Sequence, residues 1–180
     1  MIIFIVVGMP AAGKNIACEY AEKNQYPYFS TGDIVRDKVK KRGIKPDAKN
    51  TAGISTELRG EDGLGVTRMA VDEAMKKKAQ VVFLEGMRSW QEIEFIKSKA
   101  DCVVIAIVAS RNVRLTRVEQ RKRADDSAQH FSERDWREIN YGVAACIALA
   151  DEYIINTGTV NEAILQFDSI IQRTLNQIFK

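Results

Sequence analysis

The chain opens with an apolar run that leads into a loop marked by two glycines. Residues 2–7 are all isoleucine, phenylalanine or valine, and Gly8, Gly13 and Lys14 follow in the spacing G-x-x-x-x-G-K. In this spacing the backbone N–H groups of the loop surround a phosphate, and the lysine ammonium reaches the terminal phosphates. An amphipathic segment from Ile16 onward would direct the positive end of a helix at the same anion. The sequence therefore predicts a buried strand, a phosphate-binding loop and a helix.

The residue after the lysine departs from the usual form of this loop. Asn15 stands where Ser or Thr is expected, so the hydroxyl that normally binds Mg²⁺ is missing. An asparagine carbonyl oxygen is a neutral oxygen ligand and can replace that hydroxyl. We therefore expect Asn15 to be a metal ligand on which the affinity for Mg²⁺ depends.

Length and composition favour one soluble domain over residues 1–180. A chain of this length buries a full core without added cross-links. The apolar run 2–7 is too short for a membrane span and lacks the features of a signal peptide. A net charge of +3, from 27 basic and 24 acidic residues, is too small to predict nucleic-acid binding. The three cysteines, Cys18, Cys102 and Cys146, lie in apolar runs, which predicts core thiols in a reducing, cytoplasmic compartment.

Apolar strands and amphipathic segments alternate along the chain. The run 81–84 is continuous and apolar, as is typical of a strand buried on both faces of a parallel sheet, and the apolar runs 102–109 and 153–155 predict two further strands. We therefore predict an α/β fold in three layers. The polar group Glu85, Gly86 and Arg88 follows the strand 81–84, at the end where open α/β sheets bind ligands.

The segment 111–137 is rich in arginine and predicts two helices. Ser132 and Asp135 resemble a capping box that opens the second helix, with Trp136, Ile139, Val143 and Ile147 on its buried side. The only histidine, His130, lies between the two helices and is given no catalytic role. The arginines either form a solvated basic surface or surround a transferring phosphoryl group. They are Arg111, Arg114, Arg117, Arg121, Arg123, Arg134 and Arg137.

Taken in order, four motifs resemble the nucleoside monophosphate kinases, above all the short-lid adenylate kinases and the compact archaeal proteins related to them. The first is the loop from Gly8 to Lys14. The second is the octapeptide F-S-T-G-D-I-V-R at 29–36, and the third is the tetrapeptide E-G-M-R at 85–88. The fourth is the arginine pattern of Arg117, Arg121, R-A-D-D at 123–126 and Arg134. The resemblance implies a five-stranded parallel sheet with a helical monophosphate-binding insertion over 33–76 and a short lid over 121–134.

The resemblance also implies a role for each matching residue. The ATP site would comprise Gly8, Ala11, Ala12, Gly13, Lys14, Asn15 and Arg117. The acceptor monophosphate would be bound by Thr31, Gly32, Arg36, Gly86 and Arg88. Lys14, Arg88, Arg121, Arg123 and Arg134 would be catalytic and contact the phosphoryl group in transit. Asn15 and Glu85 would hold Mg²⁺.

These motifs predict ATP-dependent transfer of a phosphoryl group to a nucleoside monophosphate, with AMP as the first candidate. No proline precedes Arg88, and Gln91 only approximates the glutamine that reads the acceptor base in the family. Two alternatives therefore stay open. One is a kinase of another small molecule, such as a dephospho-coenzyme A kinase-like enzyme. The other is a nucleotide-binding protein with little turnover.

Overall fold

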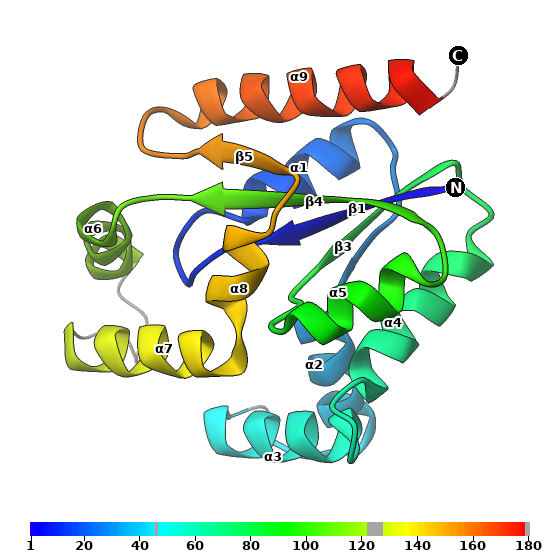
Figure 1. The fold of residues 1–180 in the computed structure, drawn as a ribbon. Coiled ribbons are helices and arrows are strands. Elements are labelled where there is room, and N and C mark those ends of the chain that lie inside the picture. Colours follow the sequence, from blue (N-terminus) through cyan, green and yellow to red (C-terminus); the bar gives the residue numbers. More distant parts are fainter. Residues whose placement is uncertain (46, 122–127, 179–180) are drawn as a thin grey trace.

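The computed structural model describes residues 1–45, 47–121 and 128–178. Five parallel strands form one sheet in the order β2-β3-β1-β4-β5 (Figure 1). Their bounds are β1 Ile2–Val7, β2 Tyr28–Ser30, β3 Val81–Glu85, β4 Asp101–Val108 and β5 Glu152–Ile155. The predicted three-layer α/β fold with a five-stranded parallel sheet is confirmed.

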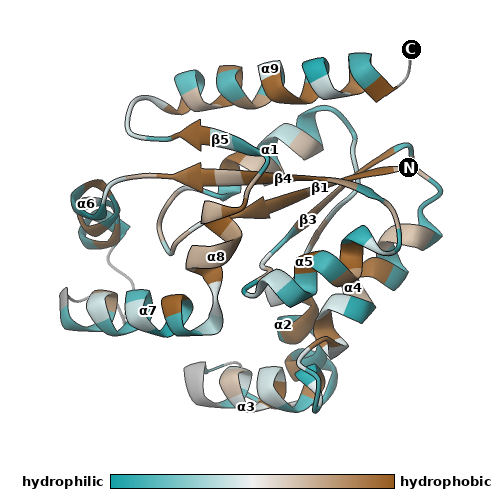
Figure 2. Ribbon diagram, in the orientation of Figure 1, coloured by the Kyte–Doolittle hydropathy of each residue, from teal (hydrophilic) through white to brown (hydrophobic). Residues whose placement is uncertain are grey.

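The central strand β1 explains how the two cores form. Every residue of β1 is buried, and its side chains alternate between the faces of the sheet. Ile2, Phe4 and Val6 join one core, while Ile3, Ile5 and Val7 join the other. Figure 2 shows the strands as the most hydrophobic part of the ribbon. A strand without a polar face can be stable only between two layers of helices.

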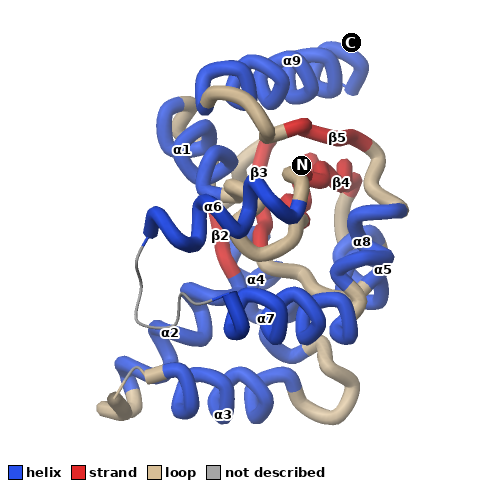
Figure 3. Tube along the Cα trace, turned by 90° about the vertical axis from the view of Figure 1, so that its left-hand side faces the viewer, coloured by secondary structure: helices blue, strands red, loops and turns tan. Residues whose placement is uncertain are grey.

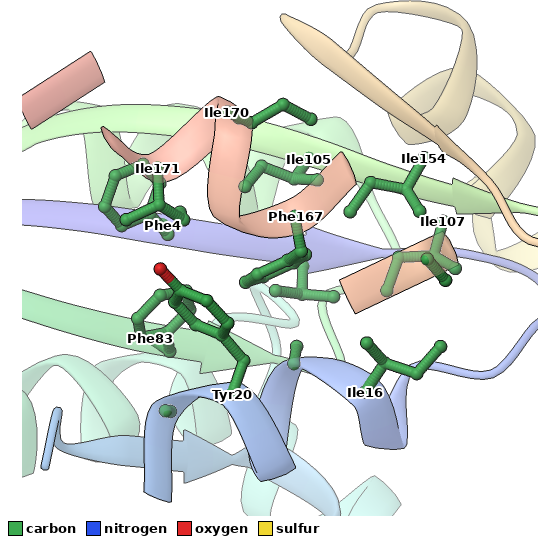
Figure 4. Close-up of a cluster of buried hydrophobic side chains, with 14 of the residues drawn as sticks. Phe4, Ile16, Tyr20, Phe83, Ile105, Ile107, Ile154, Phe167, Ile170 and Ile171 are labelled. Carbon is green, nitrogen blue, oxygen red and sulfur yellow. The ribbon is translucent and has the colours of Figure 1, made fainter. Parts of the chain in front are cut away.

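Helices α1 (Asn15–Lys23) and α9 (Val160–Ile178) cover the first face. Their contact with the sheet is an aromatic cluster in which Phe83 lies 5.8 Å from Phe167 and 6.3 Å from Tyr20, measured between ring centroids. Figure 4 shows these rings against the isoleucines of the neighbouring strands. The cluster fixes α1, and with it the loop that precedes α1.

Three helices cover the other face of the sheet: α4 (Gly65–Lys76), α5 (Trp90–Lys97) and α8 (Val143–Ala148). Cys146 of α8 is buried in this core, as predicted, whereas Cys18 and Cys102 are only partly buried. All three thiols are free.

Between β2 and β3 the chain forms a small cluster of its own. The helices α2 (Thr31–Lys41) and α3 (Ala48–Arg59) pack with α4 through Val35, Val39, Ile54 and Val66. Among the residues that the structure describes, four buried ones hold this cluster, whereas each face of the sheet has a far larger core. Segments with so few buried apolar contacts have low local stability.

Helices α6 (Arg111–Arg121) and α7 (Ala128–Tyr141) lie at the carboxyl ends of the strands, in the foreground of Figure 3. Here the sequence prediction was wrong. The helix already begins at Ala128, so Ser132 lies inside it and not at its N-terminus. Trp136 is 65% exposed and Ile139 is 36% exposed.

The buried side of α7 consists instead of Phe131, Asp135 and Glu138, which also share one helical face. Two of these three residues are charged, so a search for apolar periodicity selected the neighbouring face. Gly142, with a positive φ of 105°, ends α7 and starts α8, so the predicted buried positions Val143 and Ile147 belong to a separate helix, where Val143 is buried and Ile147 packs against the core.

We expect Phe167→Ala to lower the free energy of unfolding by about 3–5 kcal/mol, because it opens a cavity in a close-packed aromatic cluster. Phe167 is fully buried between Tyr20 and Phe83. Leu165→Ala is the matched control, since Leu165 belongs to the same helix and is 69% exposed. Urea denaturation of both variants measures the difference. Equal effects would contradict this packing.

Candidate functional site

The loop between β1 and α1 leaves room for glycine alone at two positions. A Cβ atom at Gly8 would lie 2.5 Å from the carbonyl oxygen of Ile107 in the neighbouring strand. Gly13 has a φ of +97°, and a Cβ atom there would overlap the side-chain amide of Asn156. The motif glycines are thus required by close backbone approach to β4 and to the residue that follows β5.

Lys14 extends back over this loop toward its first residues. Its Nζ donates to the carbonyl oxygens of Gly8 at 3.0 Å and Met9 at 3.4 Å, and lies 3.8 Å from Oε1 of Glu85. Burial lowers the pKa of Lys14 below its ordinary value of 10.5, although the negative charges of Glu85 and Glu138 act in the opposite direction. At this ammonium, the effect of burial on the pKa therefore outweighs that of the nearby carboxylates.

The carboxyl ends of β2 and β3 bring a second group of polar residues to the same place. Ser30 and Glu85 are paired in the sheet, and the Ser30 hydroxyl donates to Oε2 of Glu85 at 3.0 Å. One residue beyond the end of each strand, the Thr31 hydroxyl donates to the Gly86 carbonyl oxygen at 3.1 Å. A Cβ atom at Gly86 would overlap the Thr31 hydroxyl, so glycine is required there as well.

A cleft of about 220 Å³ joins these two groups. It contains nine of the residues predicted for the site: Gly8, Lys14, Thr31, Gly32, Arg36, Glu85, Gly86, Arg88 and Arg134. Other residues that line it include Ser30 and Glu138. The end of the phosphate loop, the ends of two strands and α7 therefore converge on one cavity.

Within the cleft, Arg88 contacts a buried carboxylate. Its Nε lies 3.3 Å from Oε2 of Glu138, and its backbone N–H donates to Glu92 at 2.7 Å. Glu92 is 3% exposed and also closes the capping box of α5, which fixes the turn that carries Arg88. Arg36 is more exposed and pairs with Asp33 at 2.6 Å.

One aromatic side chain connects the helices on opposite sides of the cleft. The ring of Tyr141, at the end of α7, lies under the guanidinium groups of Arg59 and Arg88. Their central carbons are 5.3 Å and 5.4 Å from the ring centroid. Arg59 ends α3, so the small helical cluster and α7 meet through this stack.

The other predicted site residues that the structure describes do not line this cleft. Ala11, Ala12 and Gly13 form the outer part of the loop, and Arg117 donates to the carbonyl oxygens of Ala11 and Ala12 at 3.4 Å and 3.2 Å. Asn15 is exposed at the first position of α1. Arg121 is half-buried at the end of α6, and Arg123 lies outside the described residues.

Sequence reasoning missed several polar residues at this site. Glu138 is four residues beyond Arg134, which places both on one face of α7 and offered a usable signal. Asn156 directly follows the strand β5, at the edge of the sheet where open α/β folds bind ligands, and this position offered a second signal. The buried ion pair of Arg114 and Asp135 joins positions 21 residues apart and gave no such signal.

The structure places the two predicted magnesium ligands, Glu85 and Asn15, in different surroundings. Mg²⁺ usually takes one or two carboxylates together with phosphate oxygens and water. Glu85 meets this need, because its carboxylate lies in the cleft within 3.8 Å of Lys14. Asn15 is exposed and outside the cleft lining. Within the described ranges, no group of three or more His, Cys, Asp or Glu residues is placed to hold a metal ion.

The lowered pKa of Lys14 predicts a dependence of stability on pH. Between the folded-state pKa and 10.5 the unfolded chain binds more protons at this residue, so its contribution to stability rises with pH across that window. We therefore expect the free energy of unfolding of the wild type, minus that of Lys14→Met, to increase as the pH is raised from about 7 toward 10. Urea denaturation at several pH values measures it, with the exposed-site variant Lys23→Met as control. A difference that stays flat would contradict burial of the ammonium.

Comparison with known proteins places the chain among P-loop proteins. A family model described as AAA domain matches residues 7–132. The UPF0200 protein of Methanocaldococcus jannaschii is 36% identical over 185 residues, which cover 100% of this chain and 94% of that protein. The UPF0200 protein of Thermococcus kodakarensis is 33% identical, covering 98% of this chain and 100% of that protein.

Solved structures share the fold at low sequence identity. A Thermus thermophilus protein titled TT1252 has a TM-score of 0.67 at 16% identity, covering 97% of both chains. Shikimate kinase from Bacteroides thetaiotaomicron has a TM-score of 0.63 at 12% identity, covering 95% of this chain and 98% of that one. Shikimate kinase from Acinetobacter baumannii, in complex with shikimate, has a TM-score of 0.59 at 14% identity, covering 99% and 95%.

These similarities show the fold of P-loop kinases and leave the acceptor open, so the likeness to adenylate kinases stays a prediction. In the part of the chain that the structure describes, we find no helix with the length and apolarity needed to cross a membrane. With a phosphate loop followed by an arginine-lined cleft, and with relatives that match it over its whole length, the chain belongs to the UPF0200 family and carries the AAA domain of P-loop proteins over residues 7–132.

Proposed function

We propose that this chain is an ATP-dependent phosphotransferase that moves the γ-phosphoryl group to a nucleoside monophosphate, with AMP as the first candidate. The observation that carries the proposal is the shared cleft, which has Lys14 on its donor side and Thr31, Arg36 and Arg88 on its acceptor side. A protein that only bound a nucleotide would have no need for a second anion site beside the first.

The charges around the cleft suit phosphoryl transfer, which depends on positioning and charge neutralisation more than on covalent chemistry. We propose that Lys14 binds the donor phosphates, that Arg36 and Arg88 orient the acceptor phosphate, and that Arg134 contacts the phosphoryl group in transit. Bound Mg²⁺ would neutralise charge on the β- and γ-phosphates, and Glu85 is the residue proposed to hold it. Arg121 and Arg123 are proposed to approach the same group from the lid.

The elements around the cleft can also exclude water from it. We propose that 33–76 is the acceptor-binding insertion and 121–134 the short lid, within one domain over 1–180. The small cluster between β2 and β3 has few buried residues to resist motion. Tyr141, stacked between Arg59 and Arg88, provides a contact through which the insertion and α7 close over the acceptor. The free thiols of the three cysteines support the cytoplasm as the compartment.

A second candidate is a kinase of another small molecule, such as a dephospho-coenzyme A kinase-like enzyme. Gln91, the proposed reader of an acceptor base, is exposed on α5 and does not line the cleft. The guanidinium groups of Arg36 and Arg88 bind a carboxylate as readily as a phosphate. A nucleotide-binding protein with little turnover is the third candidate, because Asn15 is exposed outside the cleft.

A coupled assay separates these candidates. We expect ATP consumption that depends on AMP and that exceeds the rate of a Lys14→Ala control, because removal of the ammonium abolishes donor binding. CMP, UMP, GMP, dTMP, shikimate and dephospho-coenzyme A are assayed alongside. Transfer only to a hydroxyl of a compound that is not a monophosphate favours the second candidate. Activity that appears only in Asn15→Ser identifies the natural chain as a binder.

Arg134→Ala is expected to lower the turnover number about 100-fold while leaving the dissociation constant for ATP nearly unchanged, as for a group that acts mainly in the transition state. Single-turnover kinetics and calorimetric titration with ATP measure the two quantities. Arg137→Ala is the matched control, because Arg137 is an exposed arginine on the same helix. A parallel loss of ATP affinity in Arg134→Ala would contradict this role.

A further inference from the structure

Each carbonyl oxygen of the phosphate loop has a hydrogen-bond donor. Lys14 Nζ donates to Gly8 and Met9, and the N–H of Ala12 also donates to Met9 at 3.1 Å. The next three carbonyl oxygens, those of Pro10, Ala11 and Ala12, accept from side chains that lie more than 100 residues further along the chain. Such long-range partners show that the loop conformation depends on the rest of the fold.

Two of these side chains form one network at the end of β5. Asn156 is 3% exposed, and its Nδ2 donates to the Ala12 carbonyl oxygen at 2.8 Å. Arg117 donates to the same oxygen at 3.2 Å and to the backbone carbonyl oxygen of Asn156 at 2.9 Å. The Arg117 guanidinium therefore connects α6, the loop and the residue after β5.

The third side chain connects the loop to α7. Arg114 is 5% exposed and makes a two-pronged ion pair with Asp135 at 2.6 Å and 2.7 Å. Its NH1 also donates to the Pro10 carbonyl oxygen at 3.1 Å, and its guanidinium lies over the ring of Phe131 at 5.2 Å. The ion pair of Arg114 with Asp135 therefore joins α7 to the loop. Asp135 directly follows Arg134, so the pair also determines where Arg134 lies relative to the loop.

Because a peptide group is planar, a carbonyl that is held in one direction turns the next N–H the opposite way. The bonds to Pro10 and Ala12 thereby orient the N–H groups of Ala11 and Gly13. In the same way, the N–H of Ile16 donates to the Gly13 carbonyl oxygen at 3.1 Å. This bond orients the N–H of Lys14, which belongs to the same peptide group as that carbonyl. Within the described part of the chain, the N–H groups of Ala11, Gly13 and Lys14 donate to no other residue.

We infer that Arg114, Arg117 and Asn156 form an outer brace that holds the loop with its N–H groups ready for a polyphosphate, and that Arg114 also sets α7 through Asp135. This inference rests on the proposed binding of a nucleoside triphosphate. It makes these three side chains positioning residues. Arg117 then acts on the donor through the loop. Preorganisation of this kind raises affinity because less conformational freedom is lost on binding.

The test measures binding of ATP and of inorganic tripolyphosphate by calorimetry, with no turnover required. We expect Asn156→Ala and Asn156→Asp to raise both dissociation constants about 10-fold or more, since neither can donate to the Ala12 carbonyl oxygen. Asn161→Ala is the matched control, an exposed asparagine on α9. Asn156→Asp keeps the size of the side chain and an acceptor for Arg117 but adds a negative charge, whereas Asn156→Ala adds none, so a loss of affinity that both variants share reports the lost donor.

Arg114→Lys provides an independent variant. A lysine can pair with Asp135, but it lacks the planar guanidinium group that also donates to the Pro10 carbonyl oxygen. We expect the same loss of tripolyphosphate affinity, with Arg137→Lys as control. Melting temperatures are recorded for each variant, and titrations are made well below them. A role in stability alone would lower the melting temperature and leave the dissociation constants unchanged.

Folded Asn156 and Arg114 variants that bind tripolyphosphate as tightly as the wild type would overturn the brace. A wild type that binds ATP and tripolyphosphate but phosphorylates no acceptor would overturn the proposed reaction instead. The brace would then still be supported by the loss of affinity in its variants.

Discussion

The hydrogen bonds of the loop between Gly8 and Lys14 are the constraint on which the rest of this structure depends. A loop whose N–H groups face a ligand leaves its carbonyl oxygens facing the protein, and buried carbonyls without partners are costly. The fold meets this need with donors from α6 and from the residue after β5. The strand order also provides these donors. Because β1 lies between β3 and β4, the loop that follows β1 lies next to residues from both halves of the sheet.

The side of the cleft formed by β2 and β3 follows from the same parallel arrangement. Adjacent parallel strands end at one edge, so Ser30 and Glu85 become neighbours although 55 residues separate them. Glu138 approaches from α7 and pairs with Arg88, which leaves a cleft with mixed charge. Glu85 lies 3.8 Å from Lys14 and Glu138 lies 3.3 Å from Arg88, so each carboxylate holds one of these two cations in place within the cleft.

Much of the fold and part of the site could be predicted from the sequence. Continuous apolar strands that alternate with amphipathic segments gave the three-layer architecture, because each strand must be covered on both faces. The motifs at Gly8, Thr31 and Glu85 were brought to one cleft with the predicted Arg88. The prediction for α7 was wrong because its buried face contains Asp135 and Glu138, whose charges are compensated only by arginines elsewhere in the chain. The pattern of apolar residues along the sequence does not indicate such ion pairs.

The sequence by itself determined the local elements: the glycines that a tight loop requires, the apolar strands, and the lysine placed to meet a phosphate. These depend on spacing and on side-chain type, which short stretches of sequence contain in full. Only the tertiary structure decided that Asn156 donates to the loop, that Arg114 joins the loop to α7, and that Asn15 faces solvent. Those outcomes depend on which strand ends and helix faces meet in space. They follow from sheet order and burial, which are properties of the whole chain.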